Sequence, residues 1–511
     1  MSTALSWTEL RSSCQDLAAL LHFRRSGLNP TSRRRLRAGS IAIALVTVGA
    51  AVGPAYLGGP QPREQSGSIL AVFPSMCLGF LVLASISAIA SAGGREVIPR
   101  EQAVAFPISS MVDHLGALLL APLNIAWLAQ TWALLGSAAY IFGPTRLAAY
   151  ELPVVLWVVT ATALAQVFGW CAEGVRRGRH GIFAFRVFVV LMAGAAVTLV
   201  VTGRMAPLLD RSPTRFIIDV LLDGRLGHWD TWLVGVLCLA AAGLGAVVLG
   251  ALPATWALGR PMREELRLES GHHRVRPMPG SDLAMMLRID RTAIWRSVPL
   301  RRGLTVLALM PGAVALAGHL EWRMLTVLPG LVASGAALLF GVNTWCLDGR
   351  GALWRDSLPV PSWVAFASRV IVLLEVLLAS AAVTLLLAAL RAGRPSGAEL
   401  VALLCSTFVV AAQVVSASMR WSIARPFAAD LRSARATPAP PVVMAGYSAR
   451  LAVVTTFTGL IYSGLAGIGD VRIALSTTAV LLSFSVLRLV RSARRWNDPV
   501  TRARVVAVVA G

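Results

Sequence analysis

The sequence predicts an all-α protein that crosses a membrane about twelve times, built as two repeats of six helices. Three observations support this fold class. The 511 residues are 56% hydrophobic and only 14% charged, with a mean hydropathy of +0.69, which is far more apolar than a soluble protein of this size. Apolar runs long enough to cross a bilayer recur along the whole chain. The segments between them alternate between Arg-rich and Arg-poor, which is the charge pattern of a multi-pass membrane protein.

The composition also excludes several kinds of site. The 47 basic residues are all Arg, so a phosphate-binding loop that needs Lys cannot be present. The six Cys are scattered without a Cys-x-x-Cys pair, which argues against a disulfide framework and a zinc site. The net charge of +22 lies beside apolar runs, where anionic lipid explains it better than nucleic acid. We therefore expect no catalytic residue, no metal and no cofactor in this chain, and lipid but not nucleic acid as a partner.

The apolar runs define the predicted spans, and each is close to the length that a bilayer requires. They cover residues 39–59, 69–92, 115–142, 151–172, 184–203, 231–257, 303–320, 324–347, 364–390, 399–419, 448–469 and 471–490. Arg placement puts both termini on the cytoplasmic side of the cytoplasmic (inner) membrane. The expected domains are a cytoplasmic segment 1–38, repeat 39–257, a basic cytoplasmic linker 258–302, repeat 303–490 and a cytoplasmic tail 491–511.

An amphipathic segment precedes the first span of each repeat. Ser6 and Glu9 form a capping-box pattern before a helical stripe of apolar residues, and Ser281 is placed to cap a second segment of the same kind. Both are expected to lie as helices at the inner membrane interface. In the outer loop 204–230, "TRFIIDVLLDGRLGHWD" has apolar residues at helical spacing, and "GIGDVR" at the matching place in the second repeat is too short for such a helix.

A second pattern repeats between spans two and three of each half. "GGREVIPREQAVAFPISS" places Arg100 and Glu101 between Pro99 and Pro107, which start and stop a short helix. "GRGALWRDSLPVPSW" places Arg355 and Asp356 before a similar proline-rich stretch. Two copies at equivalent positions indicate exposed docking elements, over about 95–110 and 349–363. Ser110 with Asp113 is expected to cap the third span.

These features resemble the membrane subunit of a type-2 (ABC-2 class) ABC exporter, in the two-repeat form common in actinomycete drug exporters. "REVIPREQAVAFPISSMVDHLGALLLAPLNIAW" and "FRRSGLNPTSRRR" carry the resemblance. It implies an amphipathic connecting helix and a coupling helix in each half. It also implies a separate ABC ATPase, in two copies, that binds ATP and Mg, while this chain makes or breaks no bond. The implied ATPase-coupling residues are Arg95, Glu96, Arg100, Glu101, Phe106, Arg355 and Asp356. The second coupling segment is shorter than the first, a departure that puts its contact with the ATPase in doubt.

By the same analogy, spans two and five of each half line a substrate cavity between the halves. The cavity candidates are Phe73, Met76, Phe80, Phe188, Met192, Phe340, Asn343, Phe457 and Tyr462. Such a lining suits an apolar or amphipathic substrate, and a drug, a natural product, a peptide and a lipid all remain open. Met and aromatic side chains at helical spacing also fit a lipid-facing or core position.

The alternative is a proton-coupled secondary transporter of the major facilitator type, which also has twelve spans in two halves. It needs an ionisable group within the membrane, and Glu375, with Arg369 nearly two turns earlier on a similar face, is the candidate for an intramembrane charged pair. Glu375 fits equally well as a structural partner of Arg369 or of a neighbouring helix. A membrane-embedded enzyme is less well supported, because the first outer loop has Glu64 as its only acid and no H-E-x-x-H or G-x-S-x-G motif occurs.

Overall fold

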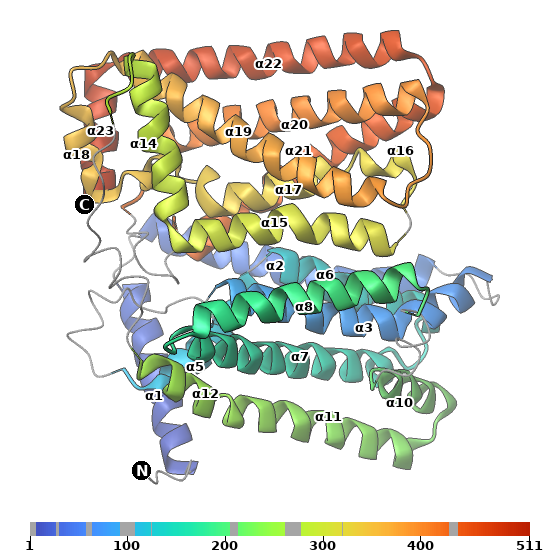
Figure 1. Ribbon diagram of the computed structural model, residues 1–511. Coiled ribbons are helices and arrows are strands. Elements are labelled where there is room, and N and C mark those ends of the chain that lie inside the picture. Colours follow the sequence, from blue (N-terminus) through green and yellow to red (C-terminus); the bar gives the residue numbers. More distant parts are fainter. Residues whose placement is uncertain are drawn as a thin grey trace. The chain divides into compact units, whose positions relative to one another are not determined.

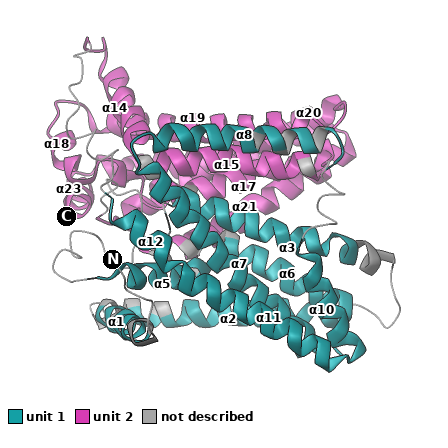
Figure 2. Ribbon diagram, turned by 60° about the horizontal axis from the view of Figure 1, so that its bottom comes forward, with its two compact units in different colours: residues 1–270 teal, residues 271–511 magenta. Residues whose placement is uncertain are grey.

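The computed structural model describes residues 7–26, 30–57, 64–91, 93, 108–123, 125–204, 213–260, 277–318, 320–428 and 438–511. Within these ranges the chain is helical and contains no β-strand. It divides into two compact units, unit 1 (Met1–Ser270) and unit 2 (Gly271–Gly511), coloured separately in Figure 2. The division falls inside the segment 258–302 that the sequence marks as a linker.

Unit 1 is a bundle of long apolar helices with shorter helices at its two ends. Its helices are α1 (Trp7–Ser26), α2 (Pro30–Leu57), α3 (Glu64–Ala90), α5 (Ser110–Leu120), η1 (Ala121–Leu123), α6 (Ile125–Phe142), α7 (Leu147–Arg176), α8 (Gly181–Val201), α10 (Arg215–Leu226), α11 (Trp229–Leu249) and α12 (Ala251–Leu258). The centre of the bundle is α7, which packs against α3, α6, α11 and α12. Helices α1, α5 and α12 lie at one end of this unit and α10 at the other (Figure 1).

Unit 2 has the same kind of bundle. Its helices are α14 (Asp282–Arg296), α15 (Val298–Ala317), α16 (Trp322–Leu325), α17 (Leu328–Ala336), η2 (Ala337–Gly341), η3 (Thr344–Leu347), η4 (Gly349–Gly351), α18 (Ala352–Asp356), α19 (Ser362–Ala389), α20 (Gly397–Ala424), α21 (Pro441–Ile468), α22 (Val471–Asn497) and α23 (Pro499–Ala510). Helices α14, α18 and α23 lie together at the end of the bundle that carries the C-terminus (Figure 1).

Eight helices in the described part of the chain are long and apolar enough to cross a membrane, so the prediction of a polytopic helical membrane protein is confirmed at this coarser level. They include α2, α3, α7, α19, α20, α21 and α22, and α11 continuing into α12. The full count of twelve spans stays a prediction. Two predicted spans are broken: 115–142 becomes α5, η1 and α6, with Pro122 at the break, and 324–347 becomes α16, α17, η2 and η3.

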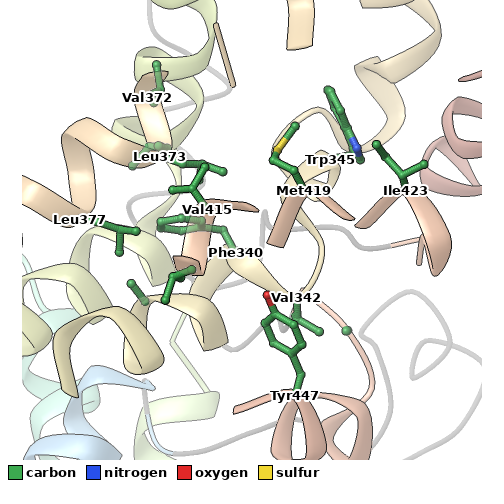
Figure 3. Close-up of a cluster of buried hydrophobic side chains, with 14 of the residues drawn as sticks. Phe340, Val342, Trp345, Val372, Leu373, Leu377, Val415, Met419, Ile423 and Tyr447 are labelled. Carbon is green, nitrogen blue, oxygen red and sulfur yellow. The ribbon is translucent and has the colours of Figure 1, made fainter. Parts of the chain in front are cut away.

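The break in the second of these segments is packed into the core of unit 2. Phe340 is buried among aliphatic side chains of α19 and α20, such as Leu377 and Val415 (Figure 3). The Asn343 side chain donates hydrogen bonds to the carbonyl oxygens of Phe427 (2.7 Å) and Pro438 (3.0 Å). These contacts fasten the broken segment to the chain at Phe427 and Pro438 and satisfy two carbonyl oxygens there.

Several locally predicted helices are present. Ser281 caps α14 by accepting a hydrogen bond from the Ala284 N–H, as expected. The cap of the third span is wrong by one residue, because Ser109 rather than Ser110 accepts the Val112 N–H. The segment 204–230, which the sequence predicts as an outer loop, contains α10, while α21 and α22 are joined by a tight turn at Gly469 and Asp470. Ser6 of the predicted capping box lies outside the described residues.

Small residues bring the bundle helices close together. A Cβ atom on Gly312 of α15 would lie 2.6 Å from the Thr384 carbonyl oxygen of α19. One turn away, the Thr384 hydroxyl donates to the Ala308 carbonyl oxygen at 2.7 Å. In unit 1, Gly243 of α11 faces Thr160 of α7, whose hydroxyl donates to Leu239 at 3.1 Å. Close approach at Gly and hydrogen bonds from Thr are the usual means of helix association in membranes.

Candidate functional site

The most highly charged buried group of the described chain is an ionic cluster of Asp290, Asp348, Arg355 and Arg369 in unit 2. Asp290 lies on α14, Asp348 follows η3, Arg355 is on α18 and Arg369 is in the second turn of α19. None of the four side chains is more than 7% exposed. The cluster therefore ties together four segments at one end of the unit 2 bundle.

The two carboxylates bridge the two guanidinium groups. Arg355 Nη1 lies 2.5 Å from Asp290 Oδ1 and 2.8 Å from Asp348 Oδ1. Arg369 Nη2 lies 3.0 Å from Asp290 Oδ1 and 2.8 Å from Asp348 Oδ1. Ser368 donates a further hydrogen bond of 2.6 Å to Asp290 Oδ2, and Arg369 donates to the Thr344 carbonyl oxygen. Each charge has opposite charges within contact distance, which is the condition for keeping charges in a low-dielectric interior.

An aromatic stack covers one side of the cluster. The rings of Trp345 and Trp496 are parallel within 6°, with centroids 3.9 Å apart. The Arg369 Cζ atom lies 5.2 Å from the centroid of the Trp345 ring, on which it makes a cation–π contact. Trp496 comes from the end of α22, so the stack joins the C-terminal part of the chain to the cluster.

The charges of the cluster favour the ionised forms of Asp290 and Arg355. Burial acts to raise the pKa of Asp290, but the positive charges of Arg369 and Arg355 outweigh it, and hydrogen bonds from Arg355 and Ser368 add to their effect. The pKa of Asp290 therefore lies below its ordinary value. Burial alone would lower the pKa of Arg355, but the carboxylates of Asp348 and Asp290 raise it above its ordinary value. The cluster has equal numbers of positive and negative groups.

The cluster is closely packed, with a small cavity beside it, and its contacts are those of a structural site. A cavity of about 30 Å³ beside it, lined by Trp345, Asp348, Arg355, Trp496 and Val505 among others, has room for about one water molecule. The Nε atom of Arg355, which lines this cavity, has no hydrogen-bond partner among the described residues, so a water there would have a donor to accept from. Helix α23 packs against α18, where Arg502 Nε lies 3.0 Å from Asp356 Oδ1.

The predicted pairing of Arg369 with Glu375 is wrong. Arg369 turns towards the cluster, whereas Glu375 accepts two hydrogen bonds from Arg291 of α14, at 2.6 and 2.9 Å. The Glu375 side chain is 41% exposed and its partner 51%. The spacing of six residues along α19 allowed the first pairing, but α14 crosses α19 and supplies a nearer cation to Glu375 and a nearer carboxylate, Asp290, to Arg369.

The predicted exposure of the second docking element is wrong for Arg355, which is buried, while Asp356 remains partly exposed beside Arg502. Two apolar residues of α18, Leu353 and Trp354, are each 60% exposed. The first docking element stays a prediction, since its residues, Arg95, Glu96, Arg100, Glu101 and Phe106, lie outside the described part of the chain.

Most cavity candidates lie in the cores of their own units. Phe73 and Phe80 are buried in unit 1, and Phe340, Asn343 and Tyr462 in unit 2, while Met76 packs against the unit 1 core. For these residues a role in lining an open cavity is not supported. Phe188, Met192 and Phe457 are more than half exposed on helix surfaces. The cavity expected between the halves stays a prediction.

Sequence reasoning missed two buried acidic groups in unit 1. Glu173 Oε1 lies 3.0 Å from Arg177 Nε near the end of α7, and Arg177 also donates to the Ala257 carbonyl oxygen. Near the start of the same helix, both carboxyl oxygens of Glu151 are buried without a hydrogen-bond partner among the described residues. Both acids lie close to the ends of the predicted span 151–172. An acid at such a place does not interrupt the apolar run, so the run gives no sign that the acid is buried.

Comparison with protein-family models, curated proteins and solved structures finds no significant match to this chain. Within the described ranges, no group of three or more His, Cys, Asp or Glu side chains is arranged to hold a metal ion. The function therefore has to be argued from the arrangement of the helices and their charged groups.

Proposed function

We propose that the chain is the permease subunit of a type-2 ABC exporter, which moves an apolar or amphipathic substrate across the cytoplasmic membrane. A separate ATPase, in two copies, supplies the energy. The absence of Lys from the sequence supports this division of labour, because the chain cannot form the Lys-containing phosphate loop of such an ATPase.

The observation that carries the proposal is a shared order of helix pairing in the two units. Counted by predicted span, the first helix packs against the third in each unit, as α2 on α6 and α15 on α19. The second packs against the fourth, as α3 on α7 and α17 on α20, and the fourth against the sixth, as α7 on α11 and α20 on α22. The same order in two units with little common sequence supports a two-repeat transporter.

The helices that precede each bundle extend this correspondence. Helix α1 packs against α5, the beginning of the third predicted span of unit 1, and α14 packs against α19, the third of unit 2. An amphipathic helix held against the third span is what a connecting helix requires. In unit 2 the ionic cluster adds a rigid joint between this helix and the short segment containing α18. Motion applied to α18 would then pass to α14 and α19 together.

The proposal is tested by ATP hydrolysis and by partner capture. The purified chain should hydrolyse no ATP, while co-expression with its ATPase partner should yield a complex with substrate-stimulated ATPase activity. ATP turnover by the chain free of any partner would contradict the proposal. So would transport that continues after the Walker A Lys of the partner is changed to Ala.

A second candidate function, a proton-coupled carrier, is favoured by one observation. The unpartnered carboxyl group of Glu151 is the kind of buried acid that carriers use to take up and release a proton. Glu375 no longer suits that role, since Arg291 holds it in an accessible ion pair. Glu151→Gln should abolish transport in a proton-coupled carrier. In an ATP-driven exporter the same change should leave ATP-driven transport unchanged.

A further inference from the structure

Three arginines lie on packed helices of unit 2, and we call them the arginine triad: Arg420 of α20, Arg450 of α21 and Arg488 of α22. Arg488 lies within electrostatic range of both Arg420 and Arg450, and α20, which carries Arg420, packs against the helices of the other two. Among the described residues, no carboxylate forms an ion pair with any of the three. Like charges in proximity repel, so an anion bound among them would stabilise this arrangement.

The three helices hold these arginines at a common level. Helix α20 packs against both α21 and α22. The Tyr447 hydroxyl on α21 and the Ser418 hydroxyl on α20 form a hydrogen bond of 3.0 Å, within one helical turn of Arg450 and Arg420. The Tyr447 ring also packs against Trp421, with ring centroids 5.0 Å apart. The backbone positions of Arg420 and Arg450 are therefore fixed by these contacts, while the side chains of the triad are exposed or half-exposed.

All three arginines lie within helices that are long and apolar enough to cross a membrane. A helix of the length of α21 measures about 42 Å, against about 30 Å for the hydrocarbon core of a bilayer. Arg450 lies about two and a half turns from the start of α21, and Arg488 about the same distance from the end of α22. Extended side chains at this depth reach the level of the lipid headgroups.

Apolar side chains continue from the triad towards the middle of the membrane. On α21, Val454, Phe457 and Ile461 follow Arg450 at intervals that place them on one helical face, and all three are exposed. On α22, Phe484 and Val480 precede Arg488 on one face and are also exposed. The rings of Phe457 and Phe484 are each 64% exposed. A cationic group above an apolar stripe matches an amphiphile with a negative head and hydrocarbon chains.

We propose that the arginine triad binds the phosphate of an anionic lipid, whose acyl chains lie along the exposed faces of α21 and α22. Guanidinium groups bind phosphate oxygens through paired, charge-assisted hydrogen bonds. The bound lipid neutralises the repulsion within the triad and holds the ends of α20, α21 and α22 together. This site is separate from the ionic cluster, whose arginines are neutralised by Asp290 and Asp348.

Thermal unfolding of the purified full chain in a neutral detergent tests the site. Phosphatidylglycerol should raise the Tm of the wild-type chain by about 2 °C or more relative to phosphatidylcholine, because a ligand that binds only the folded state stabilises it. The double variant Arg450→Gln/Arg488→Gln should lose this rise. The matched control, Arg394→Gln/Arg472→Gln, removes two exposed arginines near the opposite end of the unit and should keep it.

Two further arms make the result decisive. Arg450→Lys/Arg488→Lys should retain part of the rise, and the single variant Arg450→Gln, at an exposed side chain, should fold and show a reduced rise. Inorganic phosphate at matched ionic strength should give little stabilisation, because it lacks acyl chains. Equal lipid effects in all variants would overturn the site. Stabilisation by phosphate alone, without an effect of phosphatidylglycerol, would overturn the lipid as its occupant.

Discussion

At the scale of single residues, the partners of charged side chains decide which of them are structural. Asp290 is shared by two arginines in a buried site, whereas Glu375 has one partner in an exposed site. Removing one member of a buried ion pair leaves an uncompensated charge, which is far more costly than losing an exposed pair. We therefore expect Asp290, which contacts Arg369 in space, to be essential for stability. Glu375, which is close to Arg369 only in sequence, should contribute little.

Asp290→Asn should therefore destabilise unit 2 strongly, by about 3–5 kcal/mol in the free energy of unfolding. Glu375→Gln should cost under about 1 kcal/mol, because solvent screens this pair. Thermal or chemical unfolding of the two variants in detergent measures the difference. Equal losses of stability in the two variants would show that the buried cluster contributes no more to the stability of unit 2 than the exposed ion pair does.

The lowered pKa of Asp290 also gives a pH dependence with a definite sign. An ordinary Asp in the unfolded chain has a pKa of about 3.9, and that of Asp290 in the folded chain is lower. The stabilisation is therefore complete above about pH 4 and is lost as the pH falls through the folded value. The Tm difference between wild type and Asp290→Asn should stay constant from about pH 7 to 5 and shrink below about pH 4. A difference that widens on acidification would contradict this sign.

At the scale of the helices, close approach depends on residues without a side chain. Gly312 of α15 leaves no room for a Cβ atom against Thr384 of α19. Gly312→Leu should force these helices apart and cost about 1–3 kcal/mol or more, as overpacking does. The control is Gly464→Leu on α21, where no atom lies within 4 Å of the position of a Cβ. Comparable destabilisation by the two changes, measured as Tm in detergent, would contradict a packing role for Gly312.

The same scale explains how much of the fold the sequence predicts. Helices α10 and α14 are predictable because their sequence signals are local. These signals are apolar residues at helical spacing, a capping residue at the start of α14, and a Gly or Ser at the end of each helix. The break after α17 is not, since residues 324–347 are continuously apolar and the deviation depends on Phe340 and Asn343 fitting against other helices. The partners of Arg369 were missed for the same reason. Asp290 and Asp348 reach it only once α14 and η3 have folded against α19.

At the scale of the whole molecule, the two units share an order of helix pairing but differ at their ends. Unit 1 has α10 at the end opposite α1, where unit 2 has only a tight turn. Unit 2 has α23, which covers α18 beside the C-terminus. A transporter built from such units would receive and transmit motion asymmetrically, with the second docking element already fastened to its own bundle.

This asymmetry changes the expected effect of mutations in the two docking elements. Reversing Arg100 and Glu101 should reduce ATPase binding and transport while leaving stability intact, if both are exposed as the sequence predicts. The corresponding reversal at Arg355 should instead unfold unit 2, since Arg355 is buried between two carboxylates. Unfolding by Arg355→Glu would therefore say nothing about docking.

The informative change in unit 2 lies on the exposed side of α18. Leu353→Ser/Trp354→Ser removes two exposed apolar side chains that make no part of the ionic cluster, so the Tm in detergent should change little. If α18 contacts the ATPase, co-purification of the partner and substrate-stimulated ATP hydrolysis should both fall. The control is Trp229→Ser at the start of α11, another exposed Trp that lies outside both docking elements, which should keep both. Unchanged partner binding in the α18 variant, together with loss of binding in the Arg100/Glu101 reversal, would mean that unit 1 alone carries the docking contact. Unchanged binding in both would contradict the permease assignment.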